Sequence, residues 1–297
     1  MAERLFVFVQ FEFPWELGPS DGRYLLRTAD GEPQRVVVLG SLQGVSATGA
    51  PSRRTRRARI ASRPATPEPA PVATARVTII DPASLSAERQ AQGWLAQLDS
   101  DRETRAAIAV LNRVLYLHRI AAADPYVSEV SPEQALVIRA GWGEGEQVAD
   151  GRWLDAREVP VPATGPGRRR RWPGGRSESA ALRSGERLAQ LLGAKAQPLL
   201  CEELVLRARR DVDQGRLRHA ALELESAFAS ALPELRAEER EDLAARLDEL
   251  QQLSGGVADA AQAAREPDGE GPREDVVAHA LTRLESALRA RTAAGLG

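Results

Sequence analysis

Residues 5–13 read LFVFVQFEF, and this stretch decides the class of the fold. Every second position from residue 5 onward is apolar, with Gln10 and Glu12 between the later ones, which is the pattern of a strand with a buried face. Phe6 and Phe8 interrupt the alternation. We therefore expect the start of this strand to be covered on both faces.

Strand and turn signals continue beyond this stretch. Gly18–Gly22 is rich in turn residues, and Arg23–Thr28 and Gln34–Leu42, on either side of the Asp30-Gly31 pair, have the composition of strands. Together with the first strand they predict a three-stranded antiparallel meander. A fourth strand is predicted at Val72–Ile80, where the chain rejoins the sheet.

Two helices and one further strand follow. Asp81-Pro82 has the acidic cap and the first-turn proline of a helix start, and Ser100 with Glu103 has the capping-box pattern of a second start. Gly141–Gly151, rich in glycine and acidic residues, predicts a loop, and Arg152–Val161 predicts a short strand. The first half of the chain is therefore predicted to be a small antiparallel sheet with covering helices.

Two breaks rich in proline, glycine and arginine divide the chain. Residues 46–71 lack the apolar content to pack and predict a mobile Arg/Pro-rich insert, and residues 162–179 predict a basic Gly/Pro linker. We place the domain boundary at this linker. Residues 1–161 then form a β-rich N-terminal domain, and residues 180–297 form an acidic, all-α domain of helical hairpins. The predicted fold class is α+β.

Residues 199–233 predict two helices that pack as a hairpin. A glycine provides the turn between them, and small residues recur where two closely crossing helices need them. The positions that carry the pattern are Leu204, Ala208, Gly215, Ala220, Leu224, Ala227, Phe228 and Pro233. They resemble a single tetratricopeptide-type helical hairpin, although Asp211 stands where that family usually has an aromatic residue.

Part of the second helix of this hairpin recurs later in the chain. His219-Ala220 and Leu224–Phe228 are matched by His279-Ala280 and Leu284–Leu288, whereas Asp275 stands in place of the turn glycine. Helices rich in alanine, leucine and glutamate also produce such matches by composition alone. The resemblance implies a helical-hairpin surface for protein interactions, and it names no partner.

Two clusters of arginine are the sharpest functional signal. Their members are Arg53, Arg54, Arg56, Arg57 and Arg59 in the first break, and Arg168, Arg169, Arg170 and Arg171 beside Trp172 in the second. Guanidinium groups beside an aromatic ring favour phosphate backbones, so one interpretation is nucleic-acid binding. Contacts with an acidic partner, or with the acidic helical region, are another. Lys195 is the only lysine among 40 basic residues, so the arginines also reflect the codon usage of a GC-rich genome.

The sequence shows no catalytic, cofactor-binding or metal-binding constellation. Gly18–Gly22 matches the G-x-S-x-G string of serine hydrolases, but a strand rather than a helix is predicted after it, so we interpret it as a turn. Lys195 lacks the preceding glycine of a phosphate-binding loop. The three histidines stand far apart, and the single cysteine, Cys201, excludes an internal disulfide.

These observations predict a non-enzymatic interaction or scaffold protein that binds a protein partner through helical hairpins. A nucleic-acid-associated protein that binds phosphate backbones through the arginine clusters is the alternative. The formal net charge of −2 excludes a wholly basic coat protein. No apolar run approaches the length of a membrane span, and one cysteine fits a reducing compartment, so we expect a cytoplasmic protein without membrane contact. The oligomeric state stays open.

Overall fold

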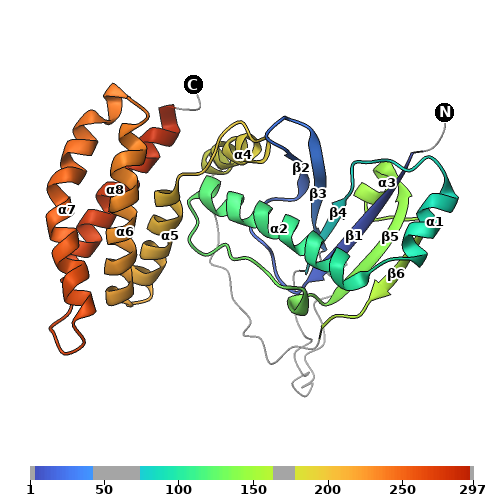
Figure 1. Cartoon of the computed structure of the whole chain (residues 1–297), viewed down its shortest axis with the longest axis horizontal. Coiled ribbons are helices and arrows are strands. Elements are labelled where there is room, and N and C mark those ends of the chain that lie inside the picture. The colour runs from blue at the N-terminus through green and yellow to red at the C-terminus, as the bar shows by residue number, and fades with distance from the viewer. Residues whose placement is uncertain (1–3, 43–73, 163–177, 295–297) are drawn as a thin grey trace, which may run out of the picture. The chain divides into compact units, whose positions relative to one another are not determined.

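The computed structural model describes residues 4–42, 74–162 and 178–294 (Figure 1). These residues form two compact units. The first takes in residues 4–25, 33–42, 74–111 and 130–162, and the second takes in residues 26–32, 112–129 and 178–294. The second unit thus contains two segments that precede residues 162–179, in addition to the C-terminal helices.

The described part of the first half of the chain contains a six-stranded sheet. Its strands are β1 (Leu5–Phe13), β2 (Gly22–Arg27), β3 (Pro33–Leu42), β4 (Thr74–Ile80), β5 (Val137–Glu144) and β6 (Asp155–Val159). Their order is β2-β3-β4-β1-β5-β6, and β1 is antiparallel to both β4 and β5. The pairs β3–β4 and β5–β6 are antiparallel as well. With helices after the sheet, the predicted α+β class is confirmed.

Both faces of β1 are covered at its start, as the sequence predicted. Neighbouring side chains of a strand point to opposite faces, so Leu5 and Phe8 lie on different sides of the sheet. Leu5 belongs to a buried cluster that it shares with α1 (Glu88–Ala96). Phe8 belongs to a second cluster, which it shares with the short helix α3 (Gly145–Ala149).

The order of the strands differs from the predicted meander. β1 does not neighbour β2; instead β2, β3 and β4 follow one another in the sheet, and β4 returns beside β1. The Asp30-Gly31 turn identifies β2 and β3 as neighbours because it is a local signal, and Gly31 has a φ of +83°. The position of β1 depends on packing against distant strands, which no turn specifies.

The glycine-rich segment Gly141–Gly151 was wrongly predicted to be a loop. Its first residues complete β5, and the next ones form α3. A Cβ atom on Gly141 would lie 2.4 Å from the carbonyl oxygen of Asp155, so glycine is what permits β6 to approach β5 at this point. The glycine that suggested a loop is a requirement of strand pairing.

One helix start and one helix cap also differ from the prediction. Helix α1 begins at Glu88 rather than at Asp81-Pro82, because Leu85 exchanges two backbone hydrogen bonds with Leu5 (2.7 and 3.3 Å) and remains extended beside the sheet. Helix α2 (Ser100–Ala122) begins where predicted. Its cap, however, is the preceding Asp99, whose carboxylate accepts a hydrogen bond from a backbone N–H in the first turn (3.1 Å).

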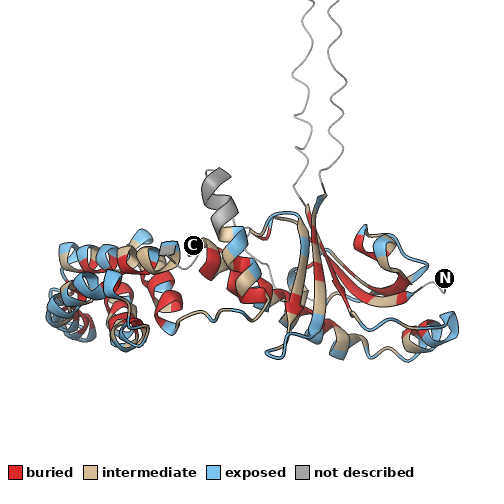
Figure 2. Ribbon diagram, turned by 90° about the horizontal axis from the view of Figure 1, so that it is seen from above, coloured by how far each residue is buried: buried red, intermediate tan, exposed pale blue. Residues whose placement is uncertain are grey.

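The C-terminal part of the chain is helical, as predicted. Its α-helices are α4 (Glu178–Leu192), α5 (Leu200–Asp213), α6 (Leu217–Arg236), α7 (Ala244–Arg265) and α8 (Glu274–Ala294). Helix α8 lies against α5, α6 and α7. These helices share one buried core, whose residues are red in Figure 2. The core includes Val205, Leu224, Phe228, Leu250, Leu281 and Leu284.

Helix α6 continues through Pro233, where the sequence predicted its end. A proline inside a helix removes one backbone hydrogen bond. The following turn is held in place by tertiary contacts: Leu235 is fully buried, and Glu234 accepts hydrogen bonds from the start of α5. The helix therefore extends to Arg236 despite the proline.

Candidate binding site in the helical unit

Helices α5 and α6 form the predicted hairpin. Gly215 between them has a φ of +69°, a conformation that favours glycine. Ala208, Ala220 and Ala227 are completely buried in the core that the two helices share. Their small side chains permit a close crossing. The hairpin is thus present, and its resemblance to the tetratricopeptide family stays a prediction.

Two carboxylates cap the N-terminus of α5. Glu234, from the last turn of α6, accepts hydrogen bonds from the backbone N–H groups of Leu200 (3.0 Å) and Cys201 (3.1 Å). Glu202 accepts one from the N–H of Leu199 (3.0 Å). Negative charge is favourable at this end of a helix. Burial is the main cause that raises the pKa of the Cys201 thiol, so the thiol stays protonated.

Two consecutive acidic residues of α5 are almost fully buried and are neutralised by arginines from three other helices. The exposed fractions of Glu202 and Glu203 are 5% and 6%. Arg119 of α2 donates to both carboxylate oxygens of Glu203 (2.6 and 2.5 Å). Arg187 of α4 donates to Glu202, and Arg291 of α8 lies 3.5 Å from it. Buried carboxylates require such partners, so these contacts fix how the helices pack.

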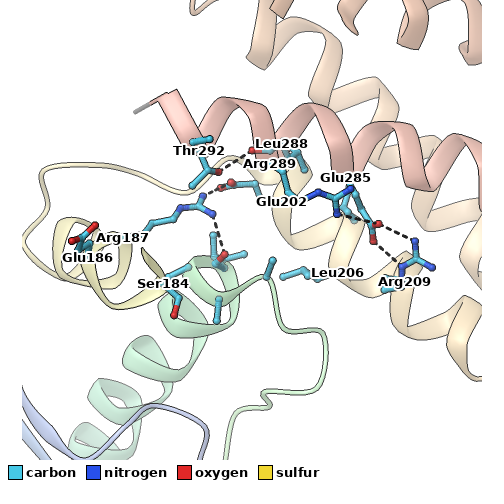
Figure 3. Close-up of a pocket in the computed structure, with 16 residues that line it drawn as sticks. Ser184, Glu186, Arg187, Glu202, Leu206, Arg209, Glu285, Leu288, Arg289 and Thr292 are labelled. Atoms are coloured by element: carbon cyan, nitrogen blue, oxygen red, sulfur yellow. Dashed lines mark hydrogen bonds and ion pairs between the residues drawn. The ribbon is translucent and has the colours of Figure 1, made fainter. Parts of the chain in front are cut away.

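A pocket of about 690 Å³ opens beside these ion pairs (Figure 3). Side chains of α2, α4, α5 and α8 line it, and all of its lining residues belong to the second unit. The apolar lining consists of Ile120, Ala121, Ala122, Ala123, Val205, Leu206, Leu288 and Ala293. The charged lining consists of Glu186, Arg187, Glu202, Arg209, Glu285 and Arg289. We call this the apolar pocket.

The three arginines of the apolar pocket differ in how fully they are engaged. The side chain of Arg187 is 11% exposed and is held by Glu202. Arg209 donates two hydrogen bonds to Glu285 (2.7 and 2.9 Å), which raise the pKa of Arg209 (Figure 3). The side chain of Arg289 is 64% exposed, and it lies 3.8 Å from Glu285. Arg289 therefore has the most freedom to meet a ligand.

A second pocket, of about 220 Å³, shares Arg187 and Thr292 with the apolar pocket. Its lining is mostly polar and consists of Arg187, Gln190, Leu191, Ala196, Gln197, Glu238, Arg240, Arg291 and Thr292. Three guanidinium groups thus line it together with one carboxylate. We call this the polar pocket.

The residues predicted as binding residues lie outside the described part of the chain. The cluster at residues 53–59 falls between residues 42 and 74, and the cluster at residues 168–172 falls between residues 162 and 178. The pocket arginines were missed because their helices also carry acidic residues, and a solvated ion pair is the usual interpretation of such a helix. One signal was available: Arg187 stands four residues before Leu191, at the edge of the apolar face of its helix.

Two features singled out in the sequence have ordinary positions in the fold. The segment at Gly18–Gly22 leads directly into β2, so it is a turn before a strand and lacks the helix of a serine hydrolase motif. Lys195 is exposed in the turn after α4. Among the described residues, no group of three or more histidine, cysteine, aspartate or glutamate side chains is arranged to hold a metal ion.

No helix in the described ranges is both long enough and apolar enough to cross a membrane. Comparisons with protein-family models, with curated proteins and with solved structures find no match for this chain.

Proposed function

We propose that the protein is a non-enzymatic, cytoplasmic interaction protein whose helical unit binds a protein partner through the apolar pocket. The occupant is a short segment of the partner that carries an apolar side chain beside an aspartate or a glutamate. One observation carries this proposal: an apolar lining lies next to Arg289, a guanidinium that is 64% exposed and only loosely paired.

The apolar lining supports the recognition of the partner's apolar side chain. Leu206 and Leu288, together with the alanines of α2 and α8, present carbon atoms to the pocket. An apolar side chain that fills it removes this surface from water, at about 25 cal/mol for each Å² buried. A volume of about 690 Å³ accommodates more than one side chain, so a short segment fits better than a single group.

The charges around the pocket support the recognition of the acidic residue. Arg289 and Arg209 both reach toward Glu285, and Arg209 alone satisfies this carboxylate with two hydrogen bonds. Arg289 can therefore turn to a carboxylate of the partner without leaving Glu285 unpaired. Such charge-assisted contacts at the rim of a pocket mainly provide orientation and specificity.

The test uses the full chain and a display library of random peptides. We expect enriched peptides that place an apolar residue next to an aspartate or a glutamate. In fluorescence anisotropy, Arg289→Glu is expected to weaken an enriched peptide about tenfold or more, since one attractive charge becomes repulsive. Arg283→Glu is the matched control, because Arg283 lies on the same helix, pairs with Glu249 and lines neither pocket.

Two outcomes would overturn the proposal. One is a library that yields no acidic-apolar peptide, and the other is equal affinity of the wild type and Arg289→Glu for the peptides that it yields. Binding of DNA or RNA that weakens steeply with salt, and is lost when Arg168–Arg171 are replaced by serine, would instead support the nucleic-acid alternative.

A further inference from the structure

We infer that the polar pocket is a binding site for a phosphate group, carried by free phosphate or by a small phosphomonoester. The site lies at Arg187, Arg240 and Arg291, which three separate parts of the helical unit bring together. This inference does not depend on the proposed function, because it concerns a different pocket and a different ligand.

The guanidinium groups of this pocket are partly shielded from water. The side chains of Arg187, Arg291 and Arg240 are 11%, 20% and 23% exposed. The one carboxylate in the lining is that of Glu238, whose side chain is 24% exposed. Electrostatic interactions are stronger at such sites than on an open surface, since the effective dielectric constant is lower.

Two of these guanidinium groups, those of Arg187 and Arg291, have a nitrogen without an acceptor, whereas all three nitrogens of Arg240 donate, to Asp242 and to the backbone carbonyl of Arg291. Each carries five N–H donors. Arg291 uses Nε on Glu238 (2.5 Å) and Nη1 on Glu202 (3.5 Å), and its Nη2 has no acceptor among the described residues. Arg187 uses its two Nη atoms, on Glu202 and on the carbonyl of Ile120 (3.1 Å), and its Nε has no acceptor in the same ranges.

The spare donors favour a ligand with several acceptor oxygens. The side-chain amides of Gln190 and Gln197 add further N–H donors to the lining. A volume of about 220 Å³ corresponds to roughly seven water molecules at about 30 Å³ each. A phosphate group with a few waters fits this space, whereas a helix or a strand of a partner does not.

Carboxylates already contact the same arginines, and this determines which anion is expected. Glu202 and Asp242 reach Arg187, Arg291 and Arg240 from outside the lining, so the ligand must compete with them. A singly charged carboxylate gains little from this exchange. A phosphate dianion carries more charge and more acceptor oxygens, which is why we assign a phosphate group to the site.

The experiment is isothermal titration of the full chain with inorganic phosphate at constant ionic strength, with glycerol phosphate as a second arm and acetate as the singly charged control. We expect saturable binding of at least one phosphate ligand and none of acetate. Tighter binding of glycerol phosphate would identify a phosphomonoester as the ligand, and binding of inorganic phosphate alone would identify the free ion. No saturable heat from either would overturn the inference.

Three variants separate a binding role from a structural one. Arg240→Gln removes one guanidinium and is expected to weaken binding about tenfold. Glu238→Gln removes the one carboxylate in the lining of the pocket and is expected to tighten phosphate binding. General damage to the fold does not produce such a change. Arg283→Gln is the control and should bind as the wild type does. Unchanged binding in Arg240→Gln, or weaker binding in Glu238→Gln, would contradict the assignment.

Discussion

Arg187 of α4 and Glu202 of α5 form an ion pair whose side chains are only 11% and 5% exposed. The pair lies at both pockets: Glu202 and Arg187 line the apolar pocket, and Arg187 also lines the polar one. A charge this shielded is unfavourable without its partner. The pair therefore fixes the position of α4 against α5, and with it the shape of the two pockets.

The first prediction concerns this pair. Arg187→Met leaves the buried Glu202 with only one nearby positive charge, Arg291 at 3.5 Å, besides the N–H of Leu199, so we expect a loss of about 3–5 kcal/mol in the free energy of unfolding. The double variant Arg187→Met/Glu202→Met removes both charges and should recover much of that loss. Urea unfolding of the single and double variants measures the difference. A double variant that is no more stable than Arg187→Met would contradict this account.

A second prediction tests the close crossing of α5 and α6. Ala227 is completely buried, and a leucine there overpacks the hairpin, so Ala227→Leu should lower the free energy of unfolding by about 1–3 kcal/mol. Ala229 is exposed on the same helix, and Ala229→Leu is the matched control with an expected change near zero. Equal effects of the two substitutions in thermal unfolding would show that the helices do not cross closely at Ala227.

The third prediction uses two strand glycines with opposite surroundings. A Cβ atom at Gly141 would lie 2.4 Å from the carbonyl oxygen of Asp155, whereas one at Gly40 would meet no atom within 4 Å. Gly141→Ala should therefore destabilise the protein by separating β5 from β6. Gly40→Ala should be neutral or slightly stabilising, because alanine restricts the unfolded chain. Denaturant midpoints of the two variants should move in different directions or by clearly different amounts.

A fourth prediction concerns alkaline pH. The pKa values of all three tyrosines are raised: mainly by burial for Tyr24 and Tyr116, and mainly by the hydrogen bond to Asp213 for Tyr126. The folded protein then holds the phenolic protons more tightly than the unfolded chain does. This contribution to stability is fully present below the ordinary tyrosine pKa of about 10, and it is lost as the pH rises through the pKa values of the folded protein.

Tyrosinate absorbance should therefore appear at higher pH in the native protein than in the protein unfolded in urea. The free energy of unfolding should fall from about pH 10 upward. In Tyr126→Phe the Asp213 contribution is absent, so the alkaline loss should be smaller. Superimposable native and unfolded titration curves would refute this prediction.

Local patterns in the sequence predicted local structure well. The alternation in residues 5–13, the Asp30-Gly31 turn and the glycine at residue 215 each specify conformation within a few residues, and each is found as expected. Strand order and pocket formation depend on pairs such as Phe8 with Ile80 and Arg187 with Glu202, which only the folded chain brings together. Gly141 misled the prediction because the residue that requires a glycine there, Asp155, is on another strand.

The burial of Cys201 has a practical consequence. It is the only thiol in the chain, none of its surface is exposed, and its backbone N–H is held by Glu234 from the neighbouring helix. A thiol reagent can reach it only when the start of α5 separates from the end of α6. The rate at which Cys201 reacts in the native protein thus reports how often this hairpin opens. The helix concerned, α5, supplies Glu202, Leu206 and Arg209 to the apolar pocket.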